Sequence, residues 1–186
     1  MKKIILFFVL MLSAPAFAQL FTFGPQFTLN STSVRTEGYN YDKSGTGMAY
    51  GGFMRVNLIL FYAQGELSYS TSEFSISKDG TAVTEYKMSG SDAALLAGFK
   101  VVPLGKLGNV RVFVGYDWKN FSKTDTNNDL NHFDTESNNN SIIIGAGVDL
   151  WKFTFDYRFL NGMTDIDRTG GEVKLNQSCF AIGFKF

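Results

Sequence analysis

Large apolar residues alternate with small or polar residues in eight segments of the chain, and this alternation restricts the fold more than any other feature of the sequence. A clear example is FTFDYRF at residues 153–159. Successive side chains of a β-strand point to opposite faces, so each segment predicts a strand with one apolar face. Beyond the N-terminal region, no stretch repeats apolar residues at helical spacing for three turns. The segments are residues 20–30, 46–58, 60–75, 85–102, 110–119, 142–150, 153–159 and 180–186.

The connections between these segments alternate in length. Those after the first, third, fifth and seventh segments are polar and mostly long, whereas those after the second, fourth and sixth are short. Antiparallel barrels in membranes have this asymmetry, with short periplasmic turns and long outer loops. The sequence therefore predicts an all-β fold, an eight-stranded antiparallel up-and-down transmembrane β-barrel with both termini in the periplasm. The long connections are residues 31–45, 77–84, 121–140 and 162–172, and the short ones are 57–60, 103–109 and 151–152.

The segment at residues 85–102 has the least regular alternation, because both of its faces are fairly apolar from Ala93 to Val102. Lys100 and Gly98 indicate which face is polar.

The apolar face could line a soluble ligand-binding barrel or coat a membrane barrel, and side-chain volume separates the two alternatives. The interior of an eight-stranded barrel is only just wide enough for side chains to fill. The large residues of the apolar face are too many for that space, whereas the opposite face is rich in Gly, Ala, Ser and Thr. The apolar face is therefore predicted to point outward into lipid, where a closed barrel satisfies every backbone donor and acceptor.

Aromatic residues stand near both ends of the predicted strands, for example Trp151 and Phe153 at the periplasmic end and Tyr116 and Trp118 at the other. Rings at these depths resemble the aromatic girdles of membrane barrels. General enrichment of aromatic residues in strands is the alternative explanation.

Ten charged residues fall on the face predicted to line the lumen, and the two signs are nearly balanced. A charge in a narrow lumen is costly unless it is paired and hydrogen-bonded. We therefore expect a network of ion pairs that crosses the barrel and plugs it, with a polar permeation path as the alternative. The ten residues are Arg55, Glu66, Lys100, Arg111, Asp117, Lys119, Asp149, Asp156, Arg158 and Lys185.

The N-terminus has the pattern of an export signal. Lys2 and Lys3 precede an apolar run at residues 4–12, and SAPAFA at residues 13–18 ends in a small-x-small motif. This predicts a cleavable signal peptide at residues 1–18 and an outer-membrane β-barrel domain at residues 19–186. A membrane anchor would need about 20 apolar residues. No cysteine lies near the cleavage site, which excludes a lipoprotein, and Cys179 is the only cysteine of the chain.

Candidate sites for chemistry are few. The chain has equal numbers of acidic and basic residues and no charge run, which argues against nucleic acid as a partner. His132, the only histidine, lies near Asp129 and Asp134 in a polar stretch, but no serine has the spacing of a nucleophile. The sequence DTNND at residues 125–129 lacks the glycine and distal glutamate of a calcium loop. We therefore expect no catalytic residue, no cofactor and no metal site.

Two adjacent stretches resemble a known family. GGFMRVNL at residues 51–58 is followed by FYAQGELSYS at residues 61–70. Together they resemble the small outer-membrane β-barrel family called PorT-like or porin-like, in which a glycine-rich strand turns tightly into a strand with a Glu-Leu-x-Tyr-Ser segment. Glu66, Leu67, Tyr69 and Ser70 match that segment. The fourth segment departs from the family pattern because it lacks a proline.

The resemblance also covers the C-terminus. Phe184 and Phe186 flank Lys185, and a final phenylalanine on the lipid face resembles the signal that outer-membrane assembly machinery recognises. The resemblance therefore implies that Phe184 and Phe186 form the assembly signal.

Three functions are compatible with these patterns. The first is a non-enzymatic outer-membrane barrel with a structural or interaction role exerted through its outer loops. The second is a narrow, porin-like pore for small solutes, and the third is a lipid-modifying enzyme that uses the outer rim. The expected location is the outer membrane. The expected partners are outer-membrane lipid, the barrel assembly machinery and, for the first function, a protein of an envelope or secretion complex.

Overall fold

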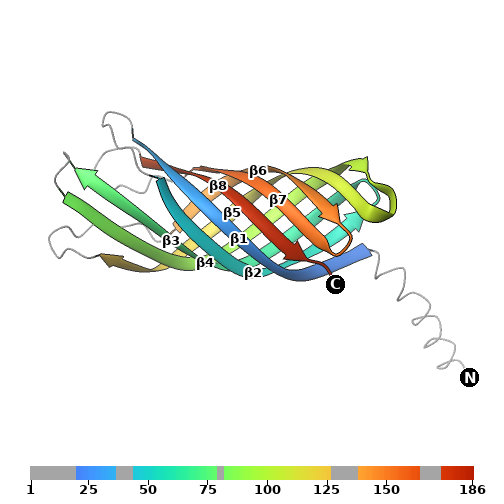
Figure 1. Cartoon of the computed structure of the whole chain (residues 1–186), viewed down its shortest axis with the longest axis horizontal. Coiled ribbons are helices and arrows are strands. Elements are labelled where there is room, and N and C mark those ends of the chain that lie inside the picture. Colours follow the sequence, from blue (N-terminus) through green and yellow to red (C-terminus); the bar gives the residue numbers. More distant parts are fainter. Residues whose placement is uncertain (1–19, 37–43, 79–81, 127–137, 164–172) are drawn as a thin grey trace, which may run out of the picture.

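The computed structural model describes residues 20–36, 44–78, 82–126, 138–163 and 173–186. Eight strands form a closed barrel in which each strand pairs antiparallel with the next along the chain, and β8 pairs with β1 (Figure 1). The predicted eight-stranded up-and-down barrel is confirmed. The strands are β1 (Phe21–Thr36), β2 (Ser44–Leu58), β3 (Phe61–Lys78), β4 (Ala82–Pro103), β5 (Gly108–Thr126), β6 (Asn138–Leu150), β7 (Phe153–Gly162) and β8 (Val173–Phe184).

Burial alternates along the strands as the sequence pattern predicts. In β7, Thr154, Asp156 and Arg158 are buried inside the barrel, while Tyr157 and Phe159 are exposed on its outer surface. The large side chains therefore cover the outside, and the small and charged ones fill the lumen, which we call the bore.

β4, the strand with the least regular alternation, turns the face that carries Lys100 and Gly98 toward the bore, as those residues indicate. Leu96, on the same parity, is 1 % exposed inside the barrel, whereas Leu95 is 57 % exposed outside. The pairing of β4 with β5 is irregular between Ser89 and Gly90 and again between Lys100 and Val102. Both faces of β4 are apolar because part of the bore is itself apolar at this level, where Leu96 packs with Phe113 and Ile143.

The strands continue further from the short turns than the apolar alternation predicts, which corrects the predicted boundaries. Residues 31–36 and 121–126, both predicted as parts of long connections, belong to β1 and β5. The apolar pattern marks only the part of a strand that faces lipid. Backbone hydrogen bonds between strands do not require one apolar and one polar face, so strand pairing continues where both faces are polar.

The short connections gather at one end of the barrel, together with the C-terminus and the start of β1 (Figure 1). β2 turns into β3 through Ile59 and Leu60, and β6 turns into β7 through Trp151 and Lys152. Ile59 and Trp151 have φ angles of 35° and 52°, in the left-handed region that such tight turns use. The β4–β5 connection contains a 3-10 turn at Gly105–Leu107.

The last residues of the chain form backbone hydrogen bonds on both sides of β8, including the seam where β8 meets β1. Lys185 donates its backbone N–H to the carbonyl oxygen of Lys152 at 2.6 Å, and Phe186 donates to the carbonyl oxygen of Phe23 at 2.9 Å. Gly24 lies so close to this seam that an added Cβ would fall 1.7 Å from the carbonyl oxygen of Phe184. Only glycine permits this approach.

Among the residues that the structure describes, no helix is long and apolar enough to cross a membrane.

Candidate functional site

The bore holds most of the charged side chains that the structure describes. Arg111 is completely buried, and Arg55 is only 1 % exposed. Buried charges require partners in a medium of low dielectric constant. The buried charged residues are Arg55, Arg111, Lys119, Arg158, Glu66, Asp92, Asp117, Asp149 and Asp156.

Six of these residues, Arg55, Glu66, Arg111, Asp149, Asp156 and Arg158, form what we call the inner tier, which extends from the middle of the bore toward the short turns.

The first ion pair of the inner tier spans the full width of the bore. Arg158 on β7 binds Glu66 on β3 through two parallel contacts, of 2.6 Å from Nη1 and 2.8 Å from Nη2. β3 and β7 are four positions apart in a ring of eight strands and therefore lie on opposite sides. A bidentate pair of this kind fixes orientation as well as charge.

The second ion pair spans the bore between β2 and β6, which also lie on opposite sides. The Arg55 Nη1 atom lies 2.8 Å from Asp149 Oδ2. Arg55 also donates from Nε to Gln64 Oε1 at 2.6 Å, and Gln64 donates in turn to Glu66. The two transverse pairs are thus linked by an amide side chain.

Arg111 joins the two pairs into one network. Its guanidinium contacts Asp156 Oδ1 at 2.5 Å and Asp149 Oδ1 at 3.4 Å. It also donates to the Tyr62 hydroxyl at 2.8 Å and to Thr154 Oγ1. Asp156 accepts a further contact of 3.0 Å from Arg158. The inner tier is therefore continuous from β2 to β3 by way of β5, β6 and β7.

Aromatic rings fill the space between these charges. The Arg55 and Arg111 guanidinium carbons lie 4.9 Å and 5.3 Å from the Tyr62 ring centroid, within the range of cation–π attraction. Tyr62 fits because its cross-strand partner is Gly98, where an added Cβ would fall 2.2 Å from the ring. The alternation of apolar residues does not predict this inward ring, although a ring paired with an inward glycine is a signal that could identify it.

Three further charges, Asp92, Asp117 and Lys119, form what we call the outer tier, on the other side of the middle of the bore. The Lys119 Nζ atom lies 3.7 Å from Asp92 Oδ2 and donates to Gln177 Oε1 at 3.2 Å. Ser70 donates to Asp92 at 3.1 Å. Asp117 makes no direct ion pair with any residue that the structure describes.

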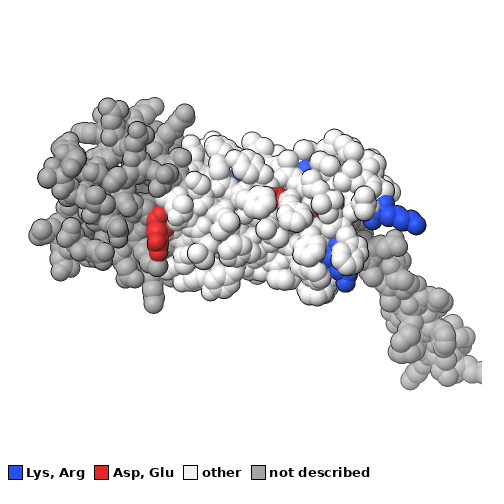
Figure 2. Space-filling view, in the orientation of Figure 1, with Lys and Arg blue, Asp and Glu red and all other residues white. Residues whose placement is uncertain are grey.

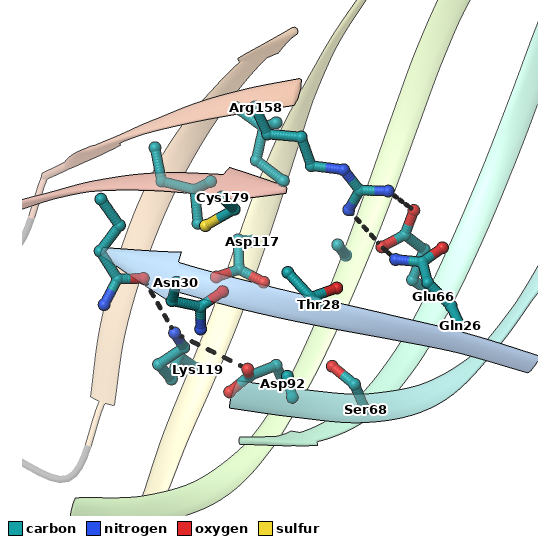
Figure 3. Close-up of a pocket in the computed structure, with 15 residues that line it drawn as sticks. Gln26, Thr28, Asn30, Glu66, Ser68, Asp92, Asp117, Lys119, Arg158 and Cys179 are labelled. Carbon is teal, nitrogen blue, oxygen red and sulfur yellow. Dashed lines mark hydrogen bonds and ion pairs between the residues drawn. The ribbon is translucent and has the colours of Figure 1, made fainter. Parts of the chain in front are cut away.

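A cavity of about 40 Å³ lies among the outer-tier residues (Figure 3). Glu66 and Arg158 of the inner tier form its floor, and Cys179 lies in its wall. The bore is therefore packed with side chains at the inner tier and partly open at the outer tier.

The structure places most of the ten predicted charges in ion pairs. Lys185 completes the set at the seam, 3.8 Å from Asp149. Lys100 and Asp117 form no ion pair in the described part of the chain. Asp92 was not predicted, although it shares the parity of Lys100 on β4. The predicted residues in ion pairs are Arg55, Glu66, Arg111, Lys119, Asp149, Asp156, Arg158 and Lys185.

The remaining sequence candidates lie elsewhere. The Phe184 and Phe186 rings pack edge to face, with their centroids 5.2 Å apart, and their role as an assembly signal stays a prediction. His132, Asp129 and Asp134 lie outside the described residues. In the ranges that the structure covers, no group of three or more His, Cys, Asp or Glu side chains is arranged to hold a metal ion.

The outer face of the barrel is apolar between two aromatic zones. Figure 2 shows this face almost without charged side chains between the two ends. Tyr50 and Tyr69 rings pack toward one end, and Phe153 packs against Phe184 at the other. Such a surface is required in lipid, and in water it would promote aggregation.

A closed barrel with an apolar outer face and a charged, largely filled bore is a transmembrane β-barrel. The sequence matches the family described as outer membrane protein beta-barrel domain over residues 4–186, and the chain belongs to this family. Its location is the outer membrane. No curated protein sequence matches the chain.

Solved structures with a similar fold include Ail, the attachment invasion locus protein of Yersinia pestis. Ail is 14 % identical, with a TM-score of 0.48, and the match covers 89 % of this chain and 98 % of Ail. Ail in complex with the heparin analogue sucrose octasulfate is 13 % identical, with a TM-score of 0.49 and coverage of 89 % and 99 %. The translocator domain of autotransporter NalP from Neisseria meningitidis is 12 % identical, with a TM-score of 0.35 and coverage of 89 % and 88 %.

Proposed function

We propose that this protein is a sealed outer-membrane barrel of structural or interaction type, which acts through its surfaces and not by conducting solutes or by catalysis. The observation that carries the proposal is the pair of ion pairs that cross the bore, Arg158 with Glu66 and Arg55 with Asp149.

Conduction through the bore would require these side chains to separate. Each is less than a tenth exposed, and each guanidinium would lose its partner in a space of low dielectric constant. Removing one partner of a buried pair costs about 3–5 kcal/mol. Transient opening at this cost would be rare, which favours a plug over a path.

The end of the barrel away from the short turns is the surface proposed for interaction. β4 and β5 have 22 and 19 residues, whereas β7 has 10. The barrel wall formed by β4 and β5 is therefore built from longer strands than the wall at β7. The polar strand ends, together with the loops that they lead to, would contact a partner at the cell surface. A protein of an envelope or secretion complex is the proposed partner, alongside membrane lipid and the barrel assembly machinery.

Conductance in planar lipid bilayers tests the sealed bore. We expect the refolded barrel to show no steady, discrete openings. A variant that lacks both transverse arginines, Arg55→Ala with Arg158→Ala, serves as the control, because the shortened side chains leave space along the axis. Discrete openings of the unmodified barrel would contradict the proposal and favour a narrow pore.

Affinity purification of the intact barrel from its own membrane tests the interaction role. A barrel in which residues 127–137 are replaced by a short Gly-Ser linker is the matched control, because its membrane-spanning part is unchanged. We expect a reproducible partner that is lost with the replacement. Equal recovery of every co-purified protein by both barrels would contradict a role for this loop.

Analysis of outer-membrane lipid tests for an enzymatic activity at the outer rim. His132→Ala should leave the composition of outer-membrane lipid unchanged by mass spectrometry. A modified lipid that disappears in this variant would show rim chemistry instead.

A further inference from the structure

The charges around the outer-tier cavity do not balance. Its wall contains three carboxylates and two cations. Glu66 is neutralised by Arg158, and Lys119 lies nearest to Asp92. Asp117 remains, only 5 % exposed and without a direct ion pair among the described residues. The inner tier, in contrast, has three arginines and three carboxylates, so the excess negative charge of the buried set lies at the cavity.

A second observation points to a missing partner in the same place. Asn30 is 7 % exposed, and its Oδ1 atom has no hydrogen-bond partner among the residues that the structure describes. Gln26 also lines the cavity, and its Oε1 atom likewise has no partner in the described part of the chain. Figure 3 shows Asn30 and Asp117 pointing into the same space from β1 and β5. A buried oxygen without a donor is a position at which an ion or a water molecule can bind.

We propose that this cavity binds one small monovalent metal cation, of sodium or potassium size. The Asp117 carboxylate and the Asn30 amide oxygen would be its protein ligands, and water would complete its coordination. A volume of about 40 Å³ has room for an ion with one or two water molecules. One positive charge would also cancel the net negative charge of the cavity wall.

The ligand chemistry favours a monovalent ion over a divalent one. Calcium takes six to eight oxygen ligands and prefers several carboxylates. In this cavity only the Asp117 carboxylate has no ion-pair partner among the described residues. The Asp92 carboxylate is already approached by the Lys119 ammonium group. Zinc and similar metals prefer His and Cys ligands, and the described residues hold no such cluster.

Thermal unfolding of the intact barrel in detergent tests the proposal. Apparent Tm is compared in NaCl, KCl and choline chloride at equal ionic strength, because choline is too large for the cavity. We expect NaCl or KCl to raise Tm by roughly 3 °C over choline chloride, as a ligand that binds only the folded state would do. Asp117→Asn should abolish this difference, since the neutral amide no longer attracts a cation.

Two further variants keep the test decisive. Glu73→Gln removes an exposed carboxylate outside the cavity and should retain the full difference in Tm. Asn30→Ala removes the second ligand and should reduce the difference, which gives an independent result if Asp117→Asn does not fold. In crystals grown with RbCl, an anomalous peak should lie between Asp117 and Asn30.

Several results would overturn the assignment. Equal Tm in all three salts would indicate that Asp117 is neutralised by a proton. A difference that survives in Asp117→Asn would place the ion elsewhere. Stabilisation by CaCl2 alone would exclude a monovalent site.

Discussion

The inner and outer tiers of the bore use the same kinds of side chain but differ in how tightly those side chains are arranged. In the inner tier, Arg158 and Glu66 make two contacts of 2.6 Å and 2.8 Å across the full width of the barrel. In the outer tier, Lys119 and Asp92 are 3.7 Å apart, on neighbouring strands, beside a cavity. The inner tier therefore restrains opposite walls of the barrel, whereas the outer tier leaves space for water or an ion.

The difference follows from what surrounds the charges. Inner-tier arginines lie against Tyr62 and Phe113, rings that exclude water and strengthen electrostatic attraction. Outer-tier charges face Thr28, Ser68 and the open volume. The contribution of a buried charge to the stability of this barrel should therefore depend on its tier.

The largest effect is expected from Arg158→Ala. This change leaves Glu66 buried without its partner and removes a contact of Asp156, so it should lower the free energy of unfolding by about 3–5 kcal/mol. Urea unfolding in lipid vesicles, followed by tryptophan fluorescence, measures it. Lys119→Ala is the matched control in the outer tier and should cost less than half as much, because water can enter the cavity. Equal losses would remove the distinction between the tiers.

Double-mutant cycles measure the pairs themselves. Glu66→Gln with Arg158→Gln should give a coupling energy of about 2–3 kcal/mol, as expected for a bidentate buried pair. Asp92→Asn with Lys119→Gln should give about 1 kcal/mol or less, because a single contact beside a cavity is weakened by hydration. A larger coupling in the outer tier would reverse our interpretation.

Packing of the inner tier is tested by Gly98→Ala. The added methyl group would collide with the Tyr62 ring and displace it from both arginines, so a loss of about 1–3 kcal/mol is expected. Gly65→Ala on the neighbouring strand β3 is the control, since an added Cβ there meets nothing within 4 Å. Folding free energies of the two variants should therefore separate clearly. Similar values would show that the bore adapts to extra volume.

The smallest effect is expected from Ser68→Ala in the wall of the outer cavity. Its hydroxyl borders open volume, so the free energy of unfolding should change by about 0.5 kcal/mol or less. A loss of several kcal/mol would show that the cavity is an ordered part of the bore.

The sequence predicts the barrel well because two different surroundings act on alternate residues. Tyr157 and Phe159 face lipid, and Asp156 and Arg158 face the bore, so the period of two is directly visible in residues 153–159. The same pattern predicts which charges point inward. It does not predict their partners, because the pairing of Arg55 with Asp149 depends on which strands lie opposite each other and at what height.

Other features lay beyond the alternation pattern for identifiable reasons. Asp92 belongs to the segment in which both faces are apolar, since the bore beside Leu96 is itself apolar. Tyr62 was missed because the bulk of an inward ring is accommodated by Gly98 on the next strand. The polar ends of β1 and β5 carry no alternation that a sequence analysis could recognise.

The seam between the first and last strands has a consequence for how the barrel forms. Seven of the eight pairings join strands that follow each other in the chain. The eighth joins β1 to β8, and its partners, such as Phe27 and Ile182, are separated by nearly the whole length of the chain. A sheet that lacks β8 would expose two rows of unpaired backbone groups to acyl chains, at a cost of several kcal/mol for each group. Partly built intermediates are therefore unstable inside the bilayer, and the rate of assembly should be set by the late meeting of the two chain ends.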